Sequence, residues 1–303
     1  MFTIVGSGFG LYGYLPAIVE GLGEKVILPR RYERKVHERP ELTHVFEDIC
    51  WVESEDVAFE LATAAIIATP PLRQGHVLTR LLTMPNIEMF VLEKPVAETP
   101  SLARDLLARV DKANKRYHIG YTFLYTSWFD RLIWPSSSVP NCALSINWTF
   151  LAHHFRTQID TWKSAHHAGG GVLRFYGIHL IALLARYGYQ DVYTSSLEGA
   201  KANEPERWNA VFFGPGLPDC SVHVDSRNPT SSFTISQDIA GMKMPLLELS
   251  EPFAEETSIA GADARVSVLT RFLTQLRTDN SHDPEYCDRV NCLWLSVERA
   301  SAA

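Results

Sequence analysis

The sequence predicts an α/β protein with an N-terminal doubly wound parallel sheet and a C-terminal α+β part that has an open, mostly antiparallel sheet. Two observations predict this architecture. Over residues 1–120, short apolar runs alternate with helical segments, which is typical of a parallel sheet with crossover helices. After residue 121 the alternation stops, and β-type runs separated by turn residues follow. We therefore expect two domains, 1–120 and 121–303.

The composition excludes several classes of protein. The chain has 303 residues, 46% hydrophobic and 21% charged, with a net charge of −7, so nothing indicates nucleic acid or an anionic membrane as a partner. No run of about 18 apolar residues and no signal-peptide pattern occurs, so we expect a cytoplasmic protein without a membrane span. The five cysteines form no C-x-x-C pair, which favours reduced thiols, and no metal site is expected.

The first element of the expected sheet is the strand at residues 2–5, which runs directly into the glycine turn GSGFG and then a helix at 11–22. In a dinucleotide-binding Rossmann sheet, such glycines permit a tight turn, close approach of a ligand and close helix packing, with the pyrophosphate at the helix start. The strict third glycine position falls on Leu11, so a purely structural turn is the alternative. The candidate coenzyme residues here are Gly6, Gly8, Phe9, Gly10 and Leu11.

The second strand, at residues 25–29, ends without the acidic residue that binds the ribose 2′-hydroxyl of NAD. Arg30 and Arg31 follow it instead, and two guanidinium groups suit a 2′-phosphate. The sequence therefore favours NADP, with NAD as the alternative. Two solvated surface arginines are the other interpretation.

Polar residues also follow two later strands. The strand at residues 63–71 ends in Thr69 and Pro70, and a strand within residues 87–100 carries Glu93 and Lys94 before a proline. Ligands bind outside the carboxyl ends of the strands in such sheets, so these four residues are further coenzyme candidates.

Helices and one more strand complete the expected first domain. We expect helices at 72–83 and at 101–115, the second capped by Ser101. A final strand at 117–123 places Tyr121 at the cleft.

The second part begins with an expected helix at 127–134 and a break at 135–141. A β-type run at 142–152 and five more between residues 192 and 253 predict the antiparallel sheet, and residues 262–303 are mostly helical. Two pairs of adjacent histidines, 153–154 and 166–167, are expected to be solvated loop residues. Adjacent side chains point apart and are poorly placed to share one metal ion.

The order of several motifs resembles that of the glucose–fructose oxidoreductase, inositol dehydrogenase and rhizopine-catabolism (Gfo/Idh/MocA) family. The motifs are GSGFGLYGYLPAI, ATPP, LEKPVAETPS, WKS…GGGVL…GIH and the closing LSVERAS. The resemblance implies hydride transfer between a nicotinamide and a sugar-like or polyol-like alcohol or carbonyl. It also implies that Lys94 contacts substrate and nicotinamide, and that subunits assemble through the open sheet as a homodimer or homotetramer.

The catalytic region departs from the family's usual D-x-G-x-H-x-x-D. Phe175 and Ala182 occupy the two acidic positions, and His179 is kept. Three interpretations are open: catalysis by Lys94 and His179 with the hydroxyl of Tyr176, a more apolar substrate packed on Phe175, or a member that binds nucleotide or a partner without turnover. Trp162 lies where family members often carry substrate contacts, so the substrate candidates are Tyr121, Trp162, Phe175 and His179.

Overall fold

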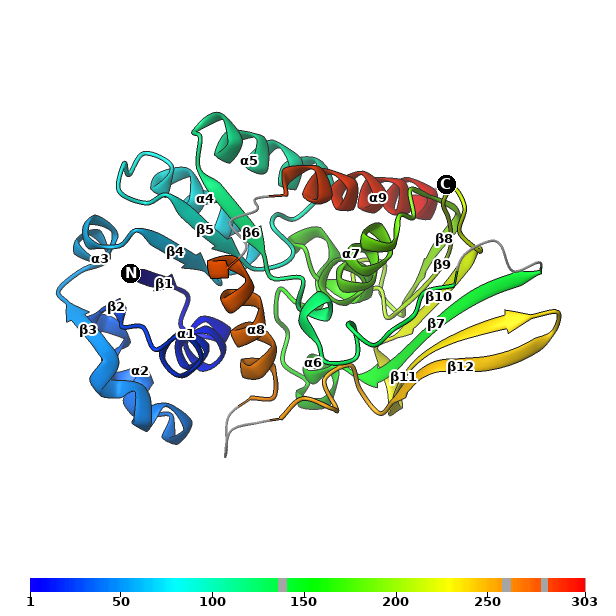
Figure 1. Ribbon diagram of the computed structural model, residues 1–303, viewed down its shortest axis with the longest axis horizontal. Helices are drawn as coiled ribbons and strands as arrows, with labels where there is room; N and C mark the ends of the chain where they lie inside the picture. The colour runs from blue at the N-terminus through cyan, green and yellow to red at the C-terminus, as the bar shows by residue number, and fades with distance from the viewer. Residues whose placement is uncertain (136–140, 258–262, 279–282, 303) are drawn as a thin grey trace. The chain divides into compact units, whose positions relative to one another are not determined.

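The computed structural model describes residues 1–135, 141–257, 263–278 and 283–302 (Figure 1). By their contacts, Met1–Ala97, Asp105–Tyr125 and Glu256–His282 form unit 1, and Glu98–Arg104, Thr126–Glu255 and Asp283–Ala303 form unit 2. These units are discontinuous, whereas the sequence predicts a single boundary after residue 120. The difference arises because the helix near the C-terminal end of unit 1 packs onto its first helix.

Unit 1 is built on a parallel sheet, as the sequence predicts, but the sheet has six strands, and the one at Ile49–Val52 is not among those expected. Its strands are β1 (Phe2–Val5), β2 (Val26–Pro29), β3 (Ile49–Val52), β4 (Ala64–Ile67), β5 (Met89–Leu92) and β6 (Arg116–Ile119). Their order is β3-β2-β1-β4-β5-β6, so the winding direction reverses between β1 and β4. Strands β1, β2, β4 and β5 are buried along their whole length. Ligands of such sheets bind at the reversal, beyond the carboxyl ends of β1 and β4.

Helices pack around this sheet in unit 1 (Figure 1). They are α1 (Leu15–Leu22), preceded by a π-helical turn (Gly10–Tyr14), α2 (Glu33–His37), α3 (Glu55–Leu61), α4 (Pro71–Leu81) and α8 (Arg265–Thr278). Helix α5 (Pro100–Lys112) belongs to unit 1 only from Asp105 onward. Short 3₁₀ turns span Arg30–Tyr32, Pro40–Asp48 and Thr122–Tyr125. Buried Leu269, Phe272 and Leu273 of α8 join the same apolar core as Leu15 and Ile18 of α1.

Two local predictions in this region are wrong. Helix α5 begins at Pro100, and Thr99 rather than Ser101 caps it, because the Thr99 hydroxyl accepts a hydrogen bond from the Leu102 N–H at 3.3 Å. The last strand ends at Ile119 instead of residue 123. Residues Thr122–Tyr125 form a 3₁₀ turn that packs against α8, with Tyr125 and Phe272 in ring contact.

Unit 2 is built on a second six-stranded sheet. Its strands are β7 (Cys142–Leu151), β8 (Asp191–Glu198), β9 (Arg207–Phe213), β10 (Cys220–Asp225), β11 (Arg227–Ile239) and β12 (Met242–Leu249). In the order β12-β11-β7-β10-β9-β8, only β7 and β10 pair in parallel, so the sheet is mostly antiparallel as predicted. Inward side chains such as Trp148, Trp208 and Phe233 alternate with outward polar ones.

The helices of unit 2 are α6 (His153–Thr157), α7 (Ile178–Tyr187) and α9 (Pro284–Ala302), with α9 packed against both β8 and α7. The helix expected at 127–134 is wrong. Residues 127–131 form turns with hydrogen bonds between residues three apart, for example Phe129 N–H to Thr126 O, and Trp128 is held by a bond to Pro252 O at 2.7 Å. Most of the expected break at 135–141 lies outside the described residues.

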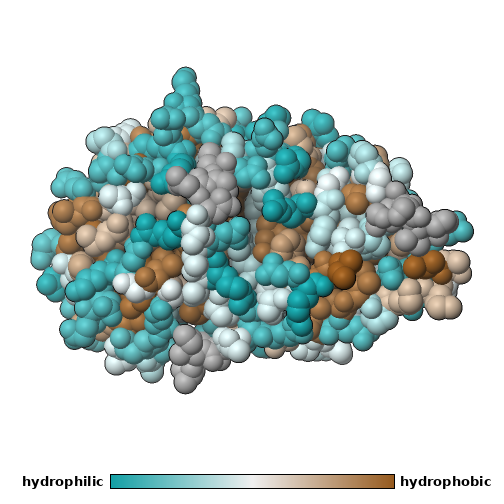
Figure 2. All heavy atoms as spheres, in the orientation of Figure 1, coloured by the Kyte–Doolittle hydropathy of each residue, from teal (hydrophilic) through white to brown (hydrophobic). Residues whose placement is uncertain are grey.

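One helical run in the described chain, His166–Tyr187, has a length and a mean hydropathy of 1.4 that would suit a membrane span. However, 83% of its most apolar stretch is buried inside the protein, as in the core helix of a globular fold. On the face drawn in Figure 2, apolar residues occur in separate groups among polar ones.

Candidate coenzyme site and catalytic segment

The glycine turn after β1 has the geometry that the sequence predicts for dinucleotide binding. Gly6 has a φ of +132°, and a Cβ there would collide with the carbonyl oxygen of Ala68. A Cβ at Gly10 would lie 2.9 Å from Ile4 Cγ2, so this glycine lets the helix pack on the strand. At Gly8, by contrast, a Cβ would meet nothing within 4 Å. The backbone at Gly8 is thus open to a ligand, while Gly6 and Gly10 on either side of it are tightly packed. A bound pyrophosphate requires this arrangement.

The helix that follows presents its N-terminus at this turn. Its first hydrogen bond runs from Leu11 N–H to Gly8 O at 2.9 Å, so the preceding N–H groups have no acceptor inside the helix. The side chain of Leu11 is fully buried in the core, so Leu11 can contribute only its backbone to a ligand. Phe9 packs across Gly13 and contacts the rings of Tyr12 and Tyr14.

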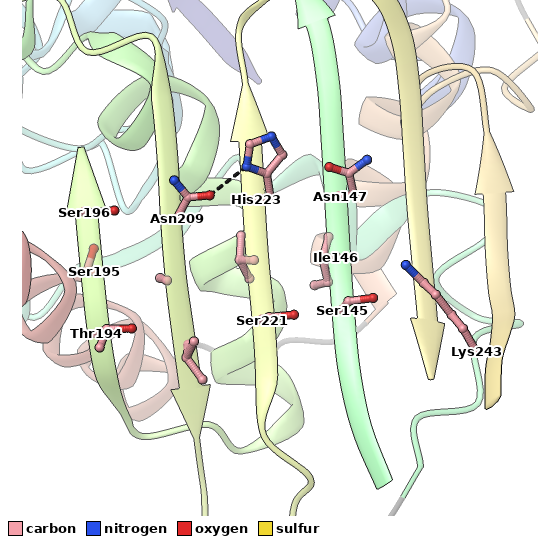
Figure 3. A pocket seen from close by; sticks show the side chains of 13 residues that line it. Ser145, Ile146, Asn147, Thr194, Ser195, Ser196, Asn209, Ser221, His223 and Lys243 are labelled. Atoms are coloured by element: carbon pink, nitrogen blue, oxygen red, sulfur yellow. Dashed lines mark hydrogen bonds between the residues drawn. The ribbon is translucent and has the colours of Figure 1, made fainter. Parts of the chain in front are cut away.

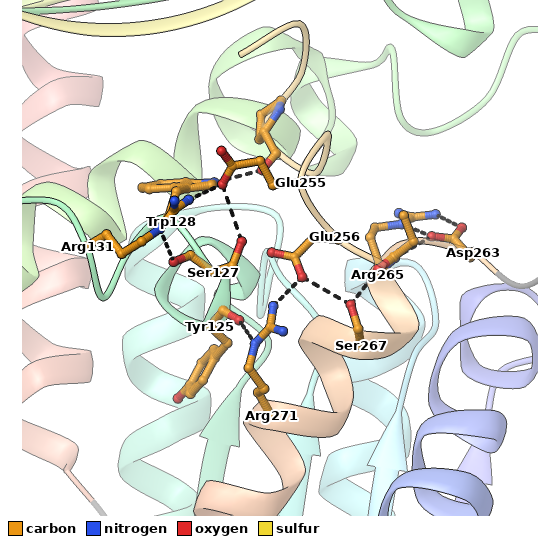
Figure 4. Close-up of polar contacts among 12 residues, drawn as sticks. Tyr125, Ser127, Trp128, Arg131, Glu255, Glu256, Asp263, Arg265, Ser267 and Arg271 are labelled. Carbon is orange, nitrogen blue, oxygen red and sulfur yellow. Dashed lines mark hydrogen bonds and ion pairs between the residues drawn. The ribbon is translucent and has the colours of Figure 1, made fainter. Parts of the chain in front are cut away.

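Arg265 lies over this turn, and sequence reasoning missed it. Its guanidinium carbon is 4.3 Å from the centre of the Phe9 ring. Asp263 holds Arg265 with two bonds of 2.8 and 2.6 Å, drawn in Figure 4. Burial disfavours the charged form, but the paired carboxylate outweighs it and raises the pKa of Arg265 above its ordinary value. The guanidinium of Arg265 is therefore held in a fixed position over Phe9, with its charge balanced by Asp263.

The end of β2 gathers more cations than the sequence indicates. Arg30 pairs with Glu33 at 3.1 Å, and Arg31 pairs with Glu55. The sequence leaves these arginines open as free solvated groups, but each is held by a carboxylate. Lys35 donates to Ser7 Oγ at 2.8 Å, which brings an ammonium group to the glycine turn itself.

Tyr32 connects the end of β2 with the turn. Its hydroxyl accepts from the N–H of Gly6 at 3.1 Å and from Arg31 at 3.0 Å. The helical position of Lys35 after the second strand was the available sequence signal for this cluster.

The carboxyl end of β4 carries Thr69 and Pro70, as predicted. Thr69 Oγ1 is enclosed and has no hydrogen-bond partner in the part of the chain that the structure describes. Pro70 is exposed and precedes α4. An enclosed hydroxyl without a partner is costly, and at this end of the sheet a bound ligand would satisfy it. The site therefore fits a dinucleotide.

The Glu93-Lys94-Pro95 segment after β5 is held from α4 by Gln74, a fully buried side chain that sequence reasoning missed. Gln74 Nε2 donates to the carbonyl oxygens of Glu93, Val96 and Pro95 at 2.7, 3.1 and 3.3 Å. Gln74 Oε1 accepts from the N–H of Glu93 at 3.1 Å. These bonds define the backbone path on either side of Lys94.

The carboxyl group of Glu93 is engaged inside unit 1. Tyr14 donates to Glu93 Oε1 at 2.6 Å, and Gly120 leaves room for this pair, since a Cβ there would lie 2.8 Å from the Tyr14 hydroxyl. Burial raises the pKa of Glu93, and the Lys94 ammonium and the Tyr14 hydrogen bond offset this only in part. Burial and the neighbouring Glu93 also raise the pKa of Tyr14. The Oε1 atom of Glu93 is therefore engaged by Tyr14, and the role of Glu93 as a coenzyme contact stays a prediction.

The catalytic segment of unit 2 begins at a tight glycine run. Gly170 passes so close to the backbone of Trp162 and Lys163 that a Cβ would collide with it, and Gly171 has a φ of +76°. Val172–Gly177 then form a π-helical turn that leads into α7. His179 lies in the first turn of α7 with only 5% of its surface exposed.

An aromatic cluster occupies the positions around the missing carboxylate. Phe175 meets the Trp162 ring edge-on at 5.3 Å, and the Lys163 ammonium lies 5.3 Å from the centre of the Phe175 ring. Tyr176 contacts the rings of Phe175 and Phe150 at 4.8 and 4.7 Å. A regular helix would direct adjacent side chains apart, but here the rings of Phe175 and Tyr176 touch because the segment is a π-helical turn. Unit 2 therefore brings Trp162, Phe175 and Tyr176 together.

Arg174 anchors the same segment to α9. Its guanidinium forms bonds of 2.7 and 2.9 Å with Glu298, which also accepts from Trp294 Nε1 at 3.0 Å. Burial opposes the charge of Glu298, but hydrogen bonds from His166 and Arg174 outweigh it and lower its pKa from 4.5 to about 2.

The prediction that all four paired histidines are solvated is wrong for two of them. His166 lies 3.6 Å from Glu298, and His154 is buried on α6. Among the described residues no group of three His, Cys, Asp or Glu side chains could hold a metal ion. Tyr121 is buried just beyond β6.

No family model matches the sequence, and no curated protein matches it. Solved structures share its fold at low identity. An oxidoreductase from Agrobacterium radiobacter in complex with NAD+, L-tartaric acid and magnesium is 12% identical, with a TM-score of 0.75 over 99% of this chain and 96% of that one. KijD10, a 3-ketoreductase from Actinomadura kijaniata in complex with NADP and TDP-benzene, is 13% identical, with a TM-score of 0.69 over 99% and 96%.

A super-repressor mutant of Gal80p from Saccharomyces cerevisiae is 12% identical, with a TM-score of 0.73 over 99% of this chain and 95% of that one. Such similarity shows the fold, which is the fold of Gfo/Idh/MocA-type dehydrogenases. The resemblance predicted from the sequence motifs is confirmed at this level.

Proposed function

We propose that this chain, with the fold of nicotinamide-dependent dehydrogenases, is an NAD(P)-dependent oxidoreductase acting on a sugar-like or polyol-like alcohol or carbonyl. The observation that carries the proposal is the glycine turn, which is tightly packed at Gly6 and Gly10 and open at Gly8. The enclosed hydroxyl of Thr69 supports a bound dinucleotide. Relatives of the same fold are complexed with NAD+ or NADP.

In the proposed reaction, the chain's own residues handle the proton. A bound nicotinamide supplies or accepts the hydride at the substrate carbon. As an alcohol is oxidised, its hydroxyl proton must pass to a base, and we assign this role to Lys94 and His179, with Tyr176 as the third candidate. In the reducing direction the same groups return the proton to the oxygen. Gln74 keeps the backbone around Lys94 in one path, which limits the positions of its ammonium group.

We infer that the coenzyme is NADP. Arg30, Arg31 and Lys35 lie beyond β2 and beside the glycine turn, where an adenosine 2′-phosphate would be held in competition with Glu33 and Glu55, the present partners of the two arginines. Trp162 and Phe175, in ring contact, supply an apolar surface on which the carbon face of a sugar could pack.

A second function is favoured by one observation. Phe175 and Ala182 fill the two positions of the usual acids, so the motif itself supplies no carboxylate to support a charged His179, and Trp162 and Lys163 pack on the Phe175 ring. This arrangement favours a protein that binds nucleotide without turnover.

Turnover with a panel of sugars, inositols and nucleotide-sugars, measured after coenzyme binding is established, separates the two functions. In the enzyme, Lys94→Ala lowers turnover about 100- to 10,000-fold while coenzyme binding persists. Tight NADPH binding without turnover of any panel member would favour the second function. Failure to bind either coenzyme would contradict both.

We further propose that the chain is a cytoplasmic homodimer or homotetramer joined through the outer face of the second sheet. Figure 3 shows Ser145, Asn147, Ser221, His223 and Asn209 side by side on this face, with His223 and Asn209 bonded at 2.7 Å. These five side chains are polar without a formal charge, and Lys243 is the charged residue among those that line the same hollow. Few charges at the centre are typical of interfaces.

Light scattering after size exclusion tests the assembly. Ser221→Arg is expected to shift the mass toward a monomer, because it places a charge at the centre of the face. Ser101→Arg, an exposed serine of α5, is the matched control and should leave the mass unchanged. Equal masses for both variants, or a monomeric native protein, would contradict the proposal.

A further inference from the structure

A second pocket lies at one end of the sheet of unit 2. It has a volume of about 560 Å³, within the range of small-molecule sites. The end of β7, helix α6, the segment between β8 and β9, and the start of β11 line it. None of Trp162, Phe175, Tyr176 and His179 lines this pocket, so it is distinct from the candidate catalytic residues of the same unit.

The charges of the pocket are mixed and slightly acidic. The lining includes three acidic residues, Asp160, Glu204 and Glu206, and two basic residues, Lys201 and Arg227, so the formal charge of the pocket is −1. Lys201 pairs with Glu204 at 2.9 Å, and Arg227 pairs with Glu206. Such a wall offers both donors and acceptors but repels a phosphate or a carboxylate.

His154 adds a polar group whose state follows from its surroundings. Its surface is only 8% exposed, and its Nδ1 is enclosed without a hydrogen-bond partner among the described residues. Burial lowers the pKa of His154 despite the nearby Glu204, so the ring is neutral. A neutral imidazole has one N–H donor and one nitrogen acceptor. Because His154 lines the pocket, its ring can form a hydrogen bond with a ligand bound there.

Phe155 provides an apolar wall beside these groups. The guanidinium carbon of Arg227 lies 5.1 Å from the centre of the Phe155 ring, and the centre of the His154 ring lies 4.2 Å from it. Both neighbours hold the Phe155 ring in place. Leu151 and Ile159 extend the apolar surface. Carboxylates, fixed N–H donors and an aromatic wall together match the alternating hydroxyl groups and carbon faces of a sugar.

We propose that this pocket binds a small polyhydroxylated molecule that is neutral or carries an amine, such as a monosaccharide or amino sugar, at a site separate from the catalytic residues. Asp160 and Glu204 accept from its hydroxyl or ammonium groups, while Gln158 donates to it and His154 forms a hydrogen bond with it. The acidic excess discriminates against phosphorylated and carboxylated sugars. This proposal goes beyond the proposed redox function and does not depend on it.

Calorimetric titration of the full chain without coenzyme tests the proposal, with D-glucosamine, myo-inositol and D-glucose 6-phosphate as probes. We expect glucosamine and inositol to bind, and the phosphate ester to bind at least about tenfold more weakly, equivalent to about 1.4 kcal/mol. Asp160→Asn with Glu204→Gln should lower glucosamine affinity at least tenfold. Glu198→Gln, an exposed acid of the same unit outside the pocket, should leave it unchanged.

Three results would overturn the proposal that this pocket binds a sugar. The first is that neither glucosamine nor inositol binds, and the second is that the double variant, with the circular dichroism of the native protein, binds glucosamine with the native affinity. The third is a sugar-soaked crystal in which the probe lies only outside this pocket. NADPH binding, followed by nicotinamide fluorescence in the same samples, reports on the redox proposal separately. Failure of one proposal can therefore be told from failure of the other.

Discussion

The side-chain amide of Gln74 bonds in both directions to the backbone of Glu93, donating to its carbonyl oxygen at 2.7 Å and accepting from its N–H at 3.1 Å. The N–H of Glu93 also donates to the carbonyl oxygen of Ile67, the last residue of β4, at 3.1 Å. Glu93, the residue before Lys94, is therefore held both by the neighbouring strand and by Gln74 of α4.

Gln74→Met is expected to lower the free energy of unfolding by about 1–3 kcal/mol, because it keeps the side-chain volume but removes the buried donor to the carbonyl oxygens of Glu93, Pro95 and Val96. Turnover should fall more than coenzyme affinity, since Lys94 loses its positioning. Denaturant unfolding and steady-state kinetics measure the two effects. Gln237→Met on β11 is the control, and equal unfolding energies for both variants would refute the role given to Gln74.

Gly6→Ala and Gly8→Ala should differ in kind. At Gly6 the added methyl group collides with Ala68 O and the φ of +132° is unfavourable, so thermal stability falls, by about 1–3 kcal/mol or more. At Gly8 the methyl group enters open space, so stability is retained while NADPH binding weakens. Melting curves with and without NADPH distinguish them. Unimpaired coenzyme binding by a folded Gly8→Ala variant would argue against the ligand position proposed here.

Removing the cations beyond β2 should change coenzyme preference. A charge-assisted bond to a phosphate contributes about 1.5–3 kcal/mol, so Arg30→Ala with Arg31→Ala should reduce the ratio of NADPH to NADH affinity at least about tenfold. Lys35→Ala should act in the same direction. Fluorescence titration with both coenzymes gives the ratio, and an unaltered ratio in both variants would leave NADP preference without support.

Glu298 makes stability depend on acidity. Its pKa is lowered from 4.5 to about 2, so its charge stabilises the fold above about pH 5, and that contribution disappears as the pH falls toward 2. The shift corresponds to roughly 3 kcal/mol at neutral pH. Glu298→Gln should therefore destabilise the protein strongly at pH 7 and much less at pH 3. A penalty independent of pH, measured by urea unfolding, would show that the carboxylate charge is not what matters.

The parts that could be predicted from the sequence are those where few residue types fit the backbone. Gly6 is one, because its turn excludes a side chain, and the short buried strands are another. Gln74 and Arg265 could not be predicted. Their roles depend on contacts with Glu93 and Phe9 that folding brings about, and a glutamine in a helix or an arginine at a helix start carries no distinctive pattern.

The wrong local predictions have a similar cause. Thr99 and Ser101 are equally good caps by residue type, and only the position of the following helix decides between them. The segment around Trp128 has helical periodicity, but the indole bond to Pro252 is specified far along the chain. The π-helical turn before His179 likewise depends on packing, since Gly177 lies against Trp208 of β9.

The packing of α8 against α1 has a consequence for biosynthesis. The first unit cannot be completed when its parallel strands leave the ribosome, because Leu269, Phe272 and Leu273 are translated more than a hundred residues later. Until then the nascent polypeptide carries an unfinished apolar groove along α1. During synthesis, α1 is therefore expected to stay without its packing partner until α8, near the C-terminal end of the sequence, has been translated. An N-terminal fragment that lacks α8 should be prone to aggregation, because it exposes this apolar surface.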